Sequence, residues 1–323
     1  MGGTGAVRVT SLPHAPIQPP SQQGPRRRPA WQRRERLAPY LFLGPAIGLF
    51  VTFLLWPLVR SLWLSFYTTA GPRSRRMVGL GNYHFLLFHD PLFWLAIINT
   101  TAYTLCFVAL LLPISLALAL ALNHPHIRGR SLLRLSFFSS YLVGPVFVAT
   151  LFFSLLSPRD GLINRMLSLL SPRFIQIDWL TDPIWVLPAL LMAGLWLACG
   201  QGMIYCLAAL QAIEPQLYEA AEMDGANAWQ RFWHITLQQT LPVLRFLALI
   251  GTVAGFQLFE LPYVLFQGPG PDLRALSIVM YLYSAGFDRG DLGYASAVGW
   301  LLVLILLVVI GTVRGIRALA ERV

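Results

Sequence analysis

Three polar side chains stand in the fifth long apolar stretch of the sequence: Gln257, Glu260 and Tyr263. An ionised acid at the centre of a membrane helix costs about 2.5–3.5 kcal/mol, so such residues tend to face a cavity or a partner. On a continuous helix their spacing puts all three on one face, where they could hydrogen-bond a polar ligand. Glu260 could equally lie near the outer membrane surface and bond to a neighbouring helix. Asn99 and Gln201 are weaker candidates, because an amide inside a span is more often an interhelical hydrogen bond.

A polar segment between the fourth and fifth apolar stretches is the second candidate site. Its sequence predicts a helix that begins at Pro215, because proline suits the first turn, and ends at Gly225, which readily takes a positive φ. Asn227 can cap a second helix, whose apolar stripe follows helical spacing: Trp229, Phe232, Trp233 and Thr236. The pattern alone leaves two interpretations open, namely a helix lying on the membrane surface and a docking site for another protein.

The remaining side chains that could do chemistry form no recognisable site. His124 and His126 share a loop with no acid beside them, which argues against a metal. Asp288 and Asp291 lie close together, but no His or nucleophile accompanies them in sequence. The three cysteines fall inside apolar stretches without ligand spacing: Cys106, Cys199 and Cys206.

The composition excludes most soluble folds. Of the 323 residues, 56% are hydrophobic and only 12% are charged, whereas a soluble domain carries about 25% charged residues. The net charge of +10 comes from arginine alone, since the sequence contains no Lys. Six of the arginines gather in residues 26–36, directly before the first apolar stretch. This position favours a membrane-flanking role over nucleic-acid binding.

Six apolar stretches approach or exceed the length of about 20 residues that a membrane-spanning helix needs. They cover residues 40–62, 93–122, 132–154, 184–210, 242–266 and 294–313. We therefore predict an all-α integral membrane protein with six transmembrane helices. An N-terminus in the cytoplasm places 15 arginines inside and 9 outside, so the positive-inside rule puts both termini in the cytoplasm.

This topology divides the chain into three parts. Residues 1–36 form a disordered, basic cytoplasmic tail, because they are rich in Pro, Gln and Arg and poor in apolar residues. Residues 37–317 form the membrane domain, with residues 211–241 as a cytoplasmic loop. Residues 318–323 form a short C-terminal tail.

The predicted cytoplasmic loop, residues 211–241, contains a motif whose residues can be compared with those of known families. Glu219-Ala220-Ala221 is followed by three residues and then Gly225, and after nine more residues by Ile-x-Leu at 235–237. This motif resembles the signature of permease subunits of binding-protein-dependent ABC importers. The longer match at 218–226 resembles the carbohydrate-importing branch, and residues 78–83 and 90–93 are similar to the maltose-type first permease. The sequence departs from the family at Gln238, where a proline is usual.

The resemblance covers about residues 37–317 and implies a type I ABC importer permease. It implies that Glu219, Ala220, Ala221, Asp224 and Gly225 form the docking turn for an ATPase. The polar residues of the spans would then meet sugar hydroxyls along the substrate path: Gln257, Glu260, Tyr263, Asn99 and Gln201.

The implied partners are a second permease subunit, an ABC ATPase dimer, an extracytoplasmic solute-binding protein and membrane lipid, with no nucleic acid. The chain would have no cofactor and no catalytic site of its own. A phosphate-binding loop requires a lysine that this sequence lacks, so ATP and Mg would belong to the ATPase. The location would be a bacterial or archaeal plasma membrane. A secondary transporter or channel remains the alternative, although a single intramembrane acid and no visible repeat speak against it.

Overall fold

The computed structural model describes residues 2–3, 42–69, 74–124, 127–158, 160–170 and 176–320. Apart from Gly2 and Gly3, the predicted N-terminal tail lies outside the described residues, as do residues 321–323 of the predicted C-terminal tail. The chain divides into two compact units, residues 1–57 and 58–323. In the first unit the structure describes Gly2, Gly3 and the beginning of the helix Phe42–Leu64.

Among the described residues, five helices are long and apolar enough to cross a membrane, and a bent pair raises the number to six. The five include the helix Phe42–Leu64, which contains the π-helical η1 (Val51–Leu55) and α2 (Trp56–Leu64). The others are α4 (Pro91–Asn123), α8 (Val186–Gln211), the helix Ala228–Phe256 and α14 (Leu292–Ala320). The six stretches found in the sequence therefore correspond to the long helices and the bent pair.

The third predicted span is not one helix, and this expectation is corrected. The structure has α5 (Arg130–Leu142) and α6 (Pro145–Leu155), which meet at 102°. Pro145 disfavours a helical conformation in the preceding residue, and Gly144 is accordingly extended, with φ −64° and ψ 148°. The prolines inside other helices are tolerated: Pro113 lies within α4 and Pro242 within α11.

The fifth helix is shifted toward the N-terminus relative to the predicted range of 242–266. It begins at Ala228 and includes α10 (Ala228–Arg231), the π-helical η2 (Phe232–Thr236) and α11 (Leu237–Phe256). It ends at Phe256, and a separate short helix, α12 (Glu260–Leu265), follows. Because Pro262 lacks an N–H, a continuous helix would leave the carbonyl group of Leu258 without its partner.

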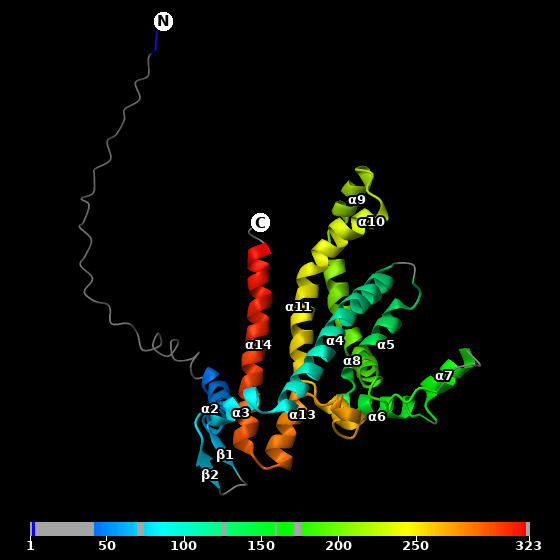
Figure 1. The fold of residues 1–323 in the computed structure, drawn as a ribbon. Helices are drawn as coiled ribbons and strands as arrows, with labels where there is room; N and C mark the ends of the chain where they lie inside the picture. Colours follow the sequence, from blue (N-terminus) through cyan, green and yellow to red (C-terminus); the bar gives the residue numbers. More distant parts are fainter. Residues whose placement is uncertain are drawn as a thin grey trace. The chain divides into compact units, whose positions relative to one another are not determined.

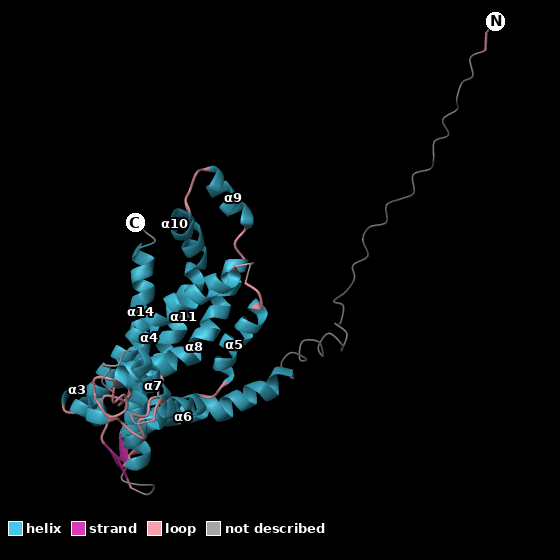
Figure 2. Cartoon of the chain, turned by 90° about the vertical axis from the view of Figure 1, so that its right-hand side faces the viewer, coloured by secondary structure: helices cyan, strands magenta, loops and turns pink. Residues whose placement is uncertain are grey.

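Within the second unit, the short elements gather at two opposite ends (Figure 1). One end holds α9 (Pro215–Met223) and α10. The other holds α3 (Gly81–Phe88), α6, α7 (Leu162–Leu170) and α13 (Ile278–Tyr283). That end also holds a hairpin of β1 (Tyr67–Thr69) and β2 (Arg75–Met77), paired antiparallel. The turned view in Figure 2 shows the same separation, and the small hairpin is the one departure from the all-α prediction among the described residues.

Small residues allow α4, α8 and α11 to pack closely. A Cβ atom added to Gly194 of α8 would lie 2.3 Å from the Tyr103 hydroxyl of α4, and one added to Gly255 of α11 would lie 2.5 Å from Thr104 Oγ1. Both distances are shorter than ordinary Cβ contacts, so a larger residue at either position would require Tyr103 or Thr104 to shift. Because the three helices pack together, side chains of α4, α8 and α11 line a common cavity.

Candidate functional site

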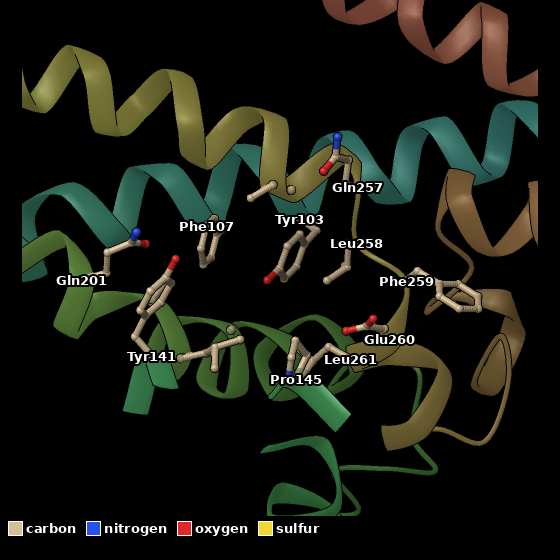
Figure 3. Close-up of a pocket in the computed structure, with 15 residues that line it drawn as sticks. Tyr103, Phe107, Tyr141, Pro145, Gln201, Gln257, Leu258, Phe259, Glu260 and Leu261 are labelled. Carbon is tan, nitrogen blue, oxygen red and sulfur yellow. The ribbon is translucent and has the colours of Figure 1, made fainter. Parts of the chain in front are cut away.

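The space between α4, α5, α8, α11 and α12 is a cavity of about 490 Å³ (Figure 3). We call it the central cavity. Its volume lies within the usual range of small-molecule pockets, about 300–1,000 Å³. Its lining is largely apolar, with a few polar side chains from different helices. A cavity of this kind suits a ligand that has both apolar faces and polar groups.

The structure brings three of the five predicted substrate-path residues to the central cavity: Gln201, Gln257 and Glu260. In Figure 3, Gln201 lies toward one end of the cavity and Glu260 toward the other, with Gln257 on the α11 side. None of the three side chains makes a hydrogen bond or ion pair with another described residue. Their polar atoms are therefore available to a ligand.

The local backbone explains how Gln257 and Glu260 reach the cavity. Gln257 is the C-terminal cap of α11, and its N–H donates to the carbonyl of Val253 at 3.1 Å. Glu260 is the first residue of α12, where the helix dipole favours an acid. The expectation that both residues share one helix face with Tyr263 is wrong, because the chain leaves the helical conformation between α11 and α12.

Tyr263 and Asn99 lie apart from the central cavity. Tyr263 lines a second cavity of about 450 Å³. Asn99 Nδ2 donates to the carbonyl oxygens of Leu273 and Leu276, at 2.8 and 3.3 Å, and the residue borders a third cavity of about 290 Å³. The bonding capacity of the Asn99 amide nitrogen is thus used in holding the segment before α13.

Aromatic side chains of the central cavity were not identified from the sequence. Tyr103 and Phe107 of α4 stack with their ring centroids 5.5 Å apart, and Tyr141 comes from α5. Tyr103 is buried, whereas Tyr141 is exposed. The Tyr103 hydroxyl lies within an apolar stretch, and this signal could have identified Tyr103 as a candidate cavity residue. The sequence does not indicate, however, which other helices pack around Tyr103.

The second candidate site is the turn between α9 and α10, and its local structure agrees with the sequence prediction. Gly225 has φ 78°. The N–H of Ala226 donates to the carbonyl of Ala221 at 2.9 Å, and the N–H of Gly225 donates to that of Glu222 at 3.1 Å. This pair of bonds is the Schellman motif, which ends a helix at a glycine. Asn227 and Gln230 form a reciprocal capping box that begins the next helix.

Two contacts hold α9 against the helix that follows it. The Tyr218 hydroxyl lies 2.9 Å from Thr236 Oγ1, and Arg231 Nη1 lies 3.4 Å from Glu222 Oε1. Thr236 is buried, but Trp229 at the start of the predicted apolar stripe is 68% exposed. The structure therefore forms a closed helical hairpin with an aromatic side chain on its surface.

The five predicted docking residues lie on the surface of this hairpin. Glu219, Ala220, Asp224 and Gly225 are exposed, and Ala221 is half-buried. A Cβ atom on Gly225 would meet nothing within 4 Å. Small side chains at this turn leave its backbone open to close approach by another protein.

Comparison with known proteins shows what kind of chain this is. Residues 37–322 match the family described as "Binding-protein-dependent transport system inner membrane component". The chain is 36% identical to the lactose transport system permease protein LacF of Rhizobium radiobacter, over 83% of this chain and 90% of LacF. It is 34% identical to the arabinooligosaccharides transport system permease protein AraP of Bacillus subtilis, over 85% and 87% of the two chains.

Solved structures agree with these sequence matches. A bacterial ABC transporter involved in the import of the acidic polysaccharide alginate aligns with a TM-score of 0.77 and 28% identity, over 88% of this chain and 97% of that chain. The alginate transporter in complex with its alginate pentasaccharide-bound periplasmic protein aligns with a TM-score of 0.72. The extent of these matches is sufficient to establish the family: the chain belongs to the inner membrane components of binding-protein-dependent transport systems.

Proposed function

We propose that the chain is a permease subunit of an ATP-driven ABC importer that carries a sugar or oligosaccharide. The central cavity is the observation that supports this proposal best. Aromatic rings suit the apolar faces of a sugar ring, while the amides of Gln201 and Gln257 and the carboxylate of Glu260 suit its hydroxyl groups. The substrates named for the relatives, lactose and arabinooligosaccharides, belong to the same class.

The proposed importer has several subunits. This chain would form half of the translocation path, with a second permease as the other half. Since the sequence contains no Lys, a separate ATPase dimer would bind ATP and Mg, and this chain would be neither an enzyme nor a cofactor protein. An extracytoplasmic binding protein would deliver the sugar, as the complex of the alginate transporter with a periplasmic protein suggests by analogy.

The proposed docking site for the ATPase is the turn of Glu219, Ala220, Ala221, Asp224 and Gly225. The exposure of the turn and the small side chains around it support this role, because a partner can approach the backbone closely. Acidic side chains at Glu219 and Asp224 can form charge-assisted hydrogen bonds with basic groups of the partner.

The proposed topology has both termini in the cytoplasm of a bacterial or archaeal cell, with six spans in residues 37–317. Two observations support it: the arginine distribution, and the location of the docking turn at the end of the second unit opposite α3, α7 and α13. The cytoplasmic loop would be residues 211–241. The tails would be residues 1–36 and 318–323.

Co-purification followed by an ATPase assay tests this function. The chain is expressed with candidate permease, ATPase and binding-protein genes from the same genome, and the purified complex is reconstituted in liposomes. We expect ATP hydrolysis to rise when the binding protein and one sugar from a panel are added together. Purified chain that never associates with an ATPase would contradict the permease assignment, and a flat response to every sugar would contradict the carbohydrate assignment alone.

A further inference from the structure

The second cavity is lined by residues of α13 and of the turn that follows it. Figure 1 shows α13 at the end of the second unit opposite the docking turn. Its volume is about 450 Å³, close to that of the central cavity. Tyr263 and Tyr283 contribute aromatic rings to its lining, and Asp288 and Arg289 contribute charged groups. The lining therefore combines ring faces with a hydrogen-bond acceptor and donors.

The aromatic rings at this cavity form a continuous series. Phe259 and Tyr263 stack with centroids 5.2 Å apart, and Phe259 and Tyr283 also lie 5.2 Å apart. Tyr283 in turn stacks on Phe287 at 5.0 Å. Phe259 also lines the central cavity, where Figure 3 shows it beyond Glu260 at the end away from Gln201. The series therefore joins the two cavities through one side chain.

The position of Arg289 is fixed by its neighbours. Its guanidinium carbon lies 5.2 Å from the ring centroid of Tyr281 and 5.9 Å from that of Tyr294, which are cation–π distances. Both tyrosine hydroxyls donate hydrogen bonds to Asp90 Oδ2. The two rings are thereby held in place, so the guanidinium is oriented before any ligand binds.

The carboxylate of Asp288 completes the polar side of the cavity. Asp288 is exposed, and it has no hydrogen-bond or ion-pair partner in the part of the chain that the structure describes. It ends the π-helical turn η4 (Ser284–Asp288), after which the N–H of Arg289 donates to the carbonyl of Ser284 at 2.9 Å. Asp288 therefore offers a hydrogen-bond acceptor, and the adjacent Arg289 offers the several N–H donors of its guanidinium.

We propose that this second cavity is an entry subsite for a sugar ring. The ring lies against Tyr263 and Tyr283, its hydroxyls bond to Asp288 and Arg289, and it passes to the central cavity across Phe259. This inference rests on the proposed sugar import and adds a second place of contact to it. A lipid chain could not hydrogen-bond to the carboxylate of Asp288 or the guanidinium of Arg289, whereas the hydroxyl groups of a sugar can. Aromatic residues that only anchor a protein at the membrane interface would not need to surround a cavity with charged residues in its lining.

Uptake of labelled sugar by the reconstituted importer tests the subsite. The probe is whichever sugar of the panel stimulates the wild-type complex, delivered by the binding protein. Two variants remove rings, Tyr263→Leu and Tyr283→Leu, and two retain them, Tyr263→Phe and Tyr283→Phe. Phe88→Leu is the matched control, because Phe88 is an exposed aromatic residue of α3 that lines neither cavity.

We expect each ring-removing variant to lower uptake at subsaturating sugar by about fivefold, the effect of losing one aromatic stacking contact. The ring-retaining variants and Phe88→Leu should transport as the wild type does. Equal uptake by the leucine variants, in complexes of normal amount and basal ATPase activity, would overturn the subsite while sparing sugar import. A wild-type importer that transports no sugar of the panel would overturn both proposals.

Discussion

Tyr294 donates a hydrogen bond of 2.5 Å to Asp90, although 204 positions separate the two residues in the sequence. Tyr281 donates to the same carboxylate oxygen. The other oxygen, Oδ1, accepts from the N–H groups of Leu92 and Phe93 and so caps α4. One buried carboxylate therefore joins the beginning of α4 to both α13 and α14.

Replacing Asp90 with Asn should destabilise the fold. The amide retains one oxygen to cap α4 but loses the charge that two tyrosine hydroxyls share. Hydrogen bonds to a charged group contribute about 1.5–3 kcal/mol, so we expect a loss of about 2 kcal/mol. Thermal unfolding in detergent, followed by tryptophan fluorescence, measures it. Asp160→Asn is the control, since Asp160 forms an exposed pair with Arg165 and should change little.

Acid should weaken the same contact. Burial raises the pKa of Asp90, but the hydrogen bonds from Tyr281, Tyr294 and the two backbone amides outweigh burial and lower it below its ordinary value of 3.8. A group with a lowered pKa in the folded state stabilises the fold above its unfolded pKa and loses that effect as the pH falls through the folded value.

The unfolding temperature of the wild type should therefore lose the contribution of Asp90 below about pH 4. The measurement is a pH series with Asp90→Asn beside the wild type. The difference between the two proteins should shrink as the pH falls through this range. A constant difference down to the lowest pH would show that the charge of Asp90 contributes nothing.

Replacing Gly225 with Asp should uncouple the ATPase. Gly225 has φ 78°, and this left-handed conformation costs a residue with a side chain about 1–2 kcal/mol. A Cβ atom added here would meet no other atom within 4 Å. Sugar-stimulated ATP hydrolysis should fall while the chain still enters the membrane. Gly129→Asp is a matched control, because Gly129 has φ 76° and equally open surroundings but lies outside the docking turn. Similar losses in both variants would indicate strain rather than docking.

Replacing Glu260 with Gln should reduce sugar uptake without affecting assembly. The amide keeps the size of the side chain but weakens its bonds to sugar hydroxyls. Loss of a charge-assisted hydrogen bond corresponds to about tenfold in the apparent sugar affinity of the importer. Uptake kinetics measure this, with Asp272→Asn as a control, since Asp272 is exposed and lines none of the three cavities described above. Unchanged kinetics would place Glu260 outside the substrate path.

The features that the sequence predicted well depend on local interactions. Hydropathy locates a membrane helix because only the length and composition of the stretch matter. The end of α9 and the start of α10 were also predicted residue by residue, since Gly225 and Asn227 act on backbone groups a few positions away. The bend at Pro145 could have been inferred from the same local rule, but proline is also tolerated inside helices such as α4.

The features that the sequence could not supply depend on distant partners. Gln201 and Glu260 line the same cavity because glycines let both α8 and α11 pack closely on α4, and no spacing in the sequence encodes that packing. Tyr263 was grouped with Gln257 on the assumption of a continuous helix. The early end of α11 separated them, because three residues in a non-helical conformation redirect the chain.

The helix Ala228–Phe256 connects the two candidate sites directly. It has 29 residues, so at about 1.5 Å per residue it is roughly 40 Å long. The docking turn precedes it and Gln257 follows it. A tilt of about 5° around its docking end would therefore move the cavity end by about 4 Å, more than the length of a hydrogen bond. In the proposed importer, a small movement of the turn would therefore be sufficient to make or break a contact between Gln257 and a ligand in the central cavity.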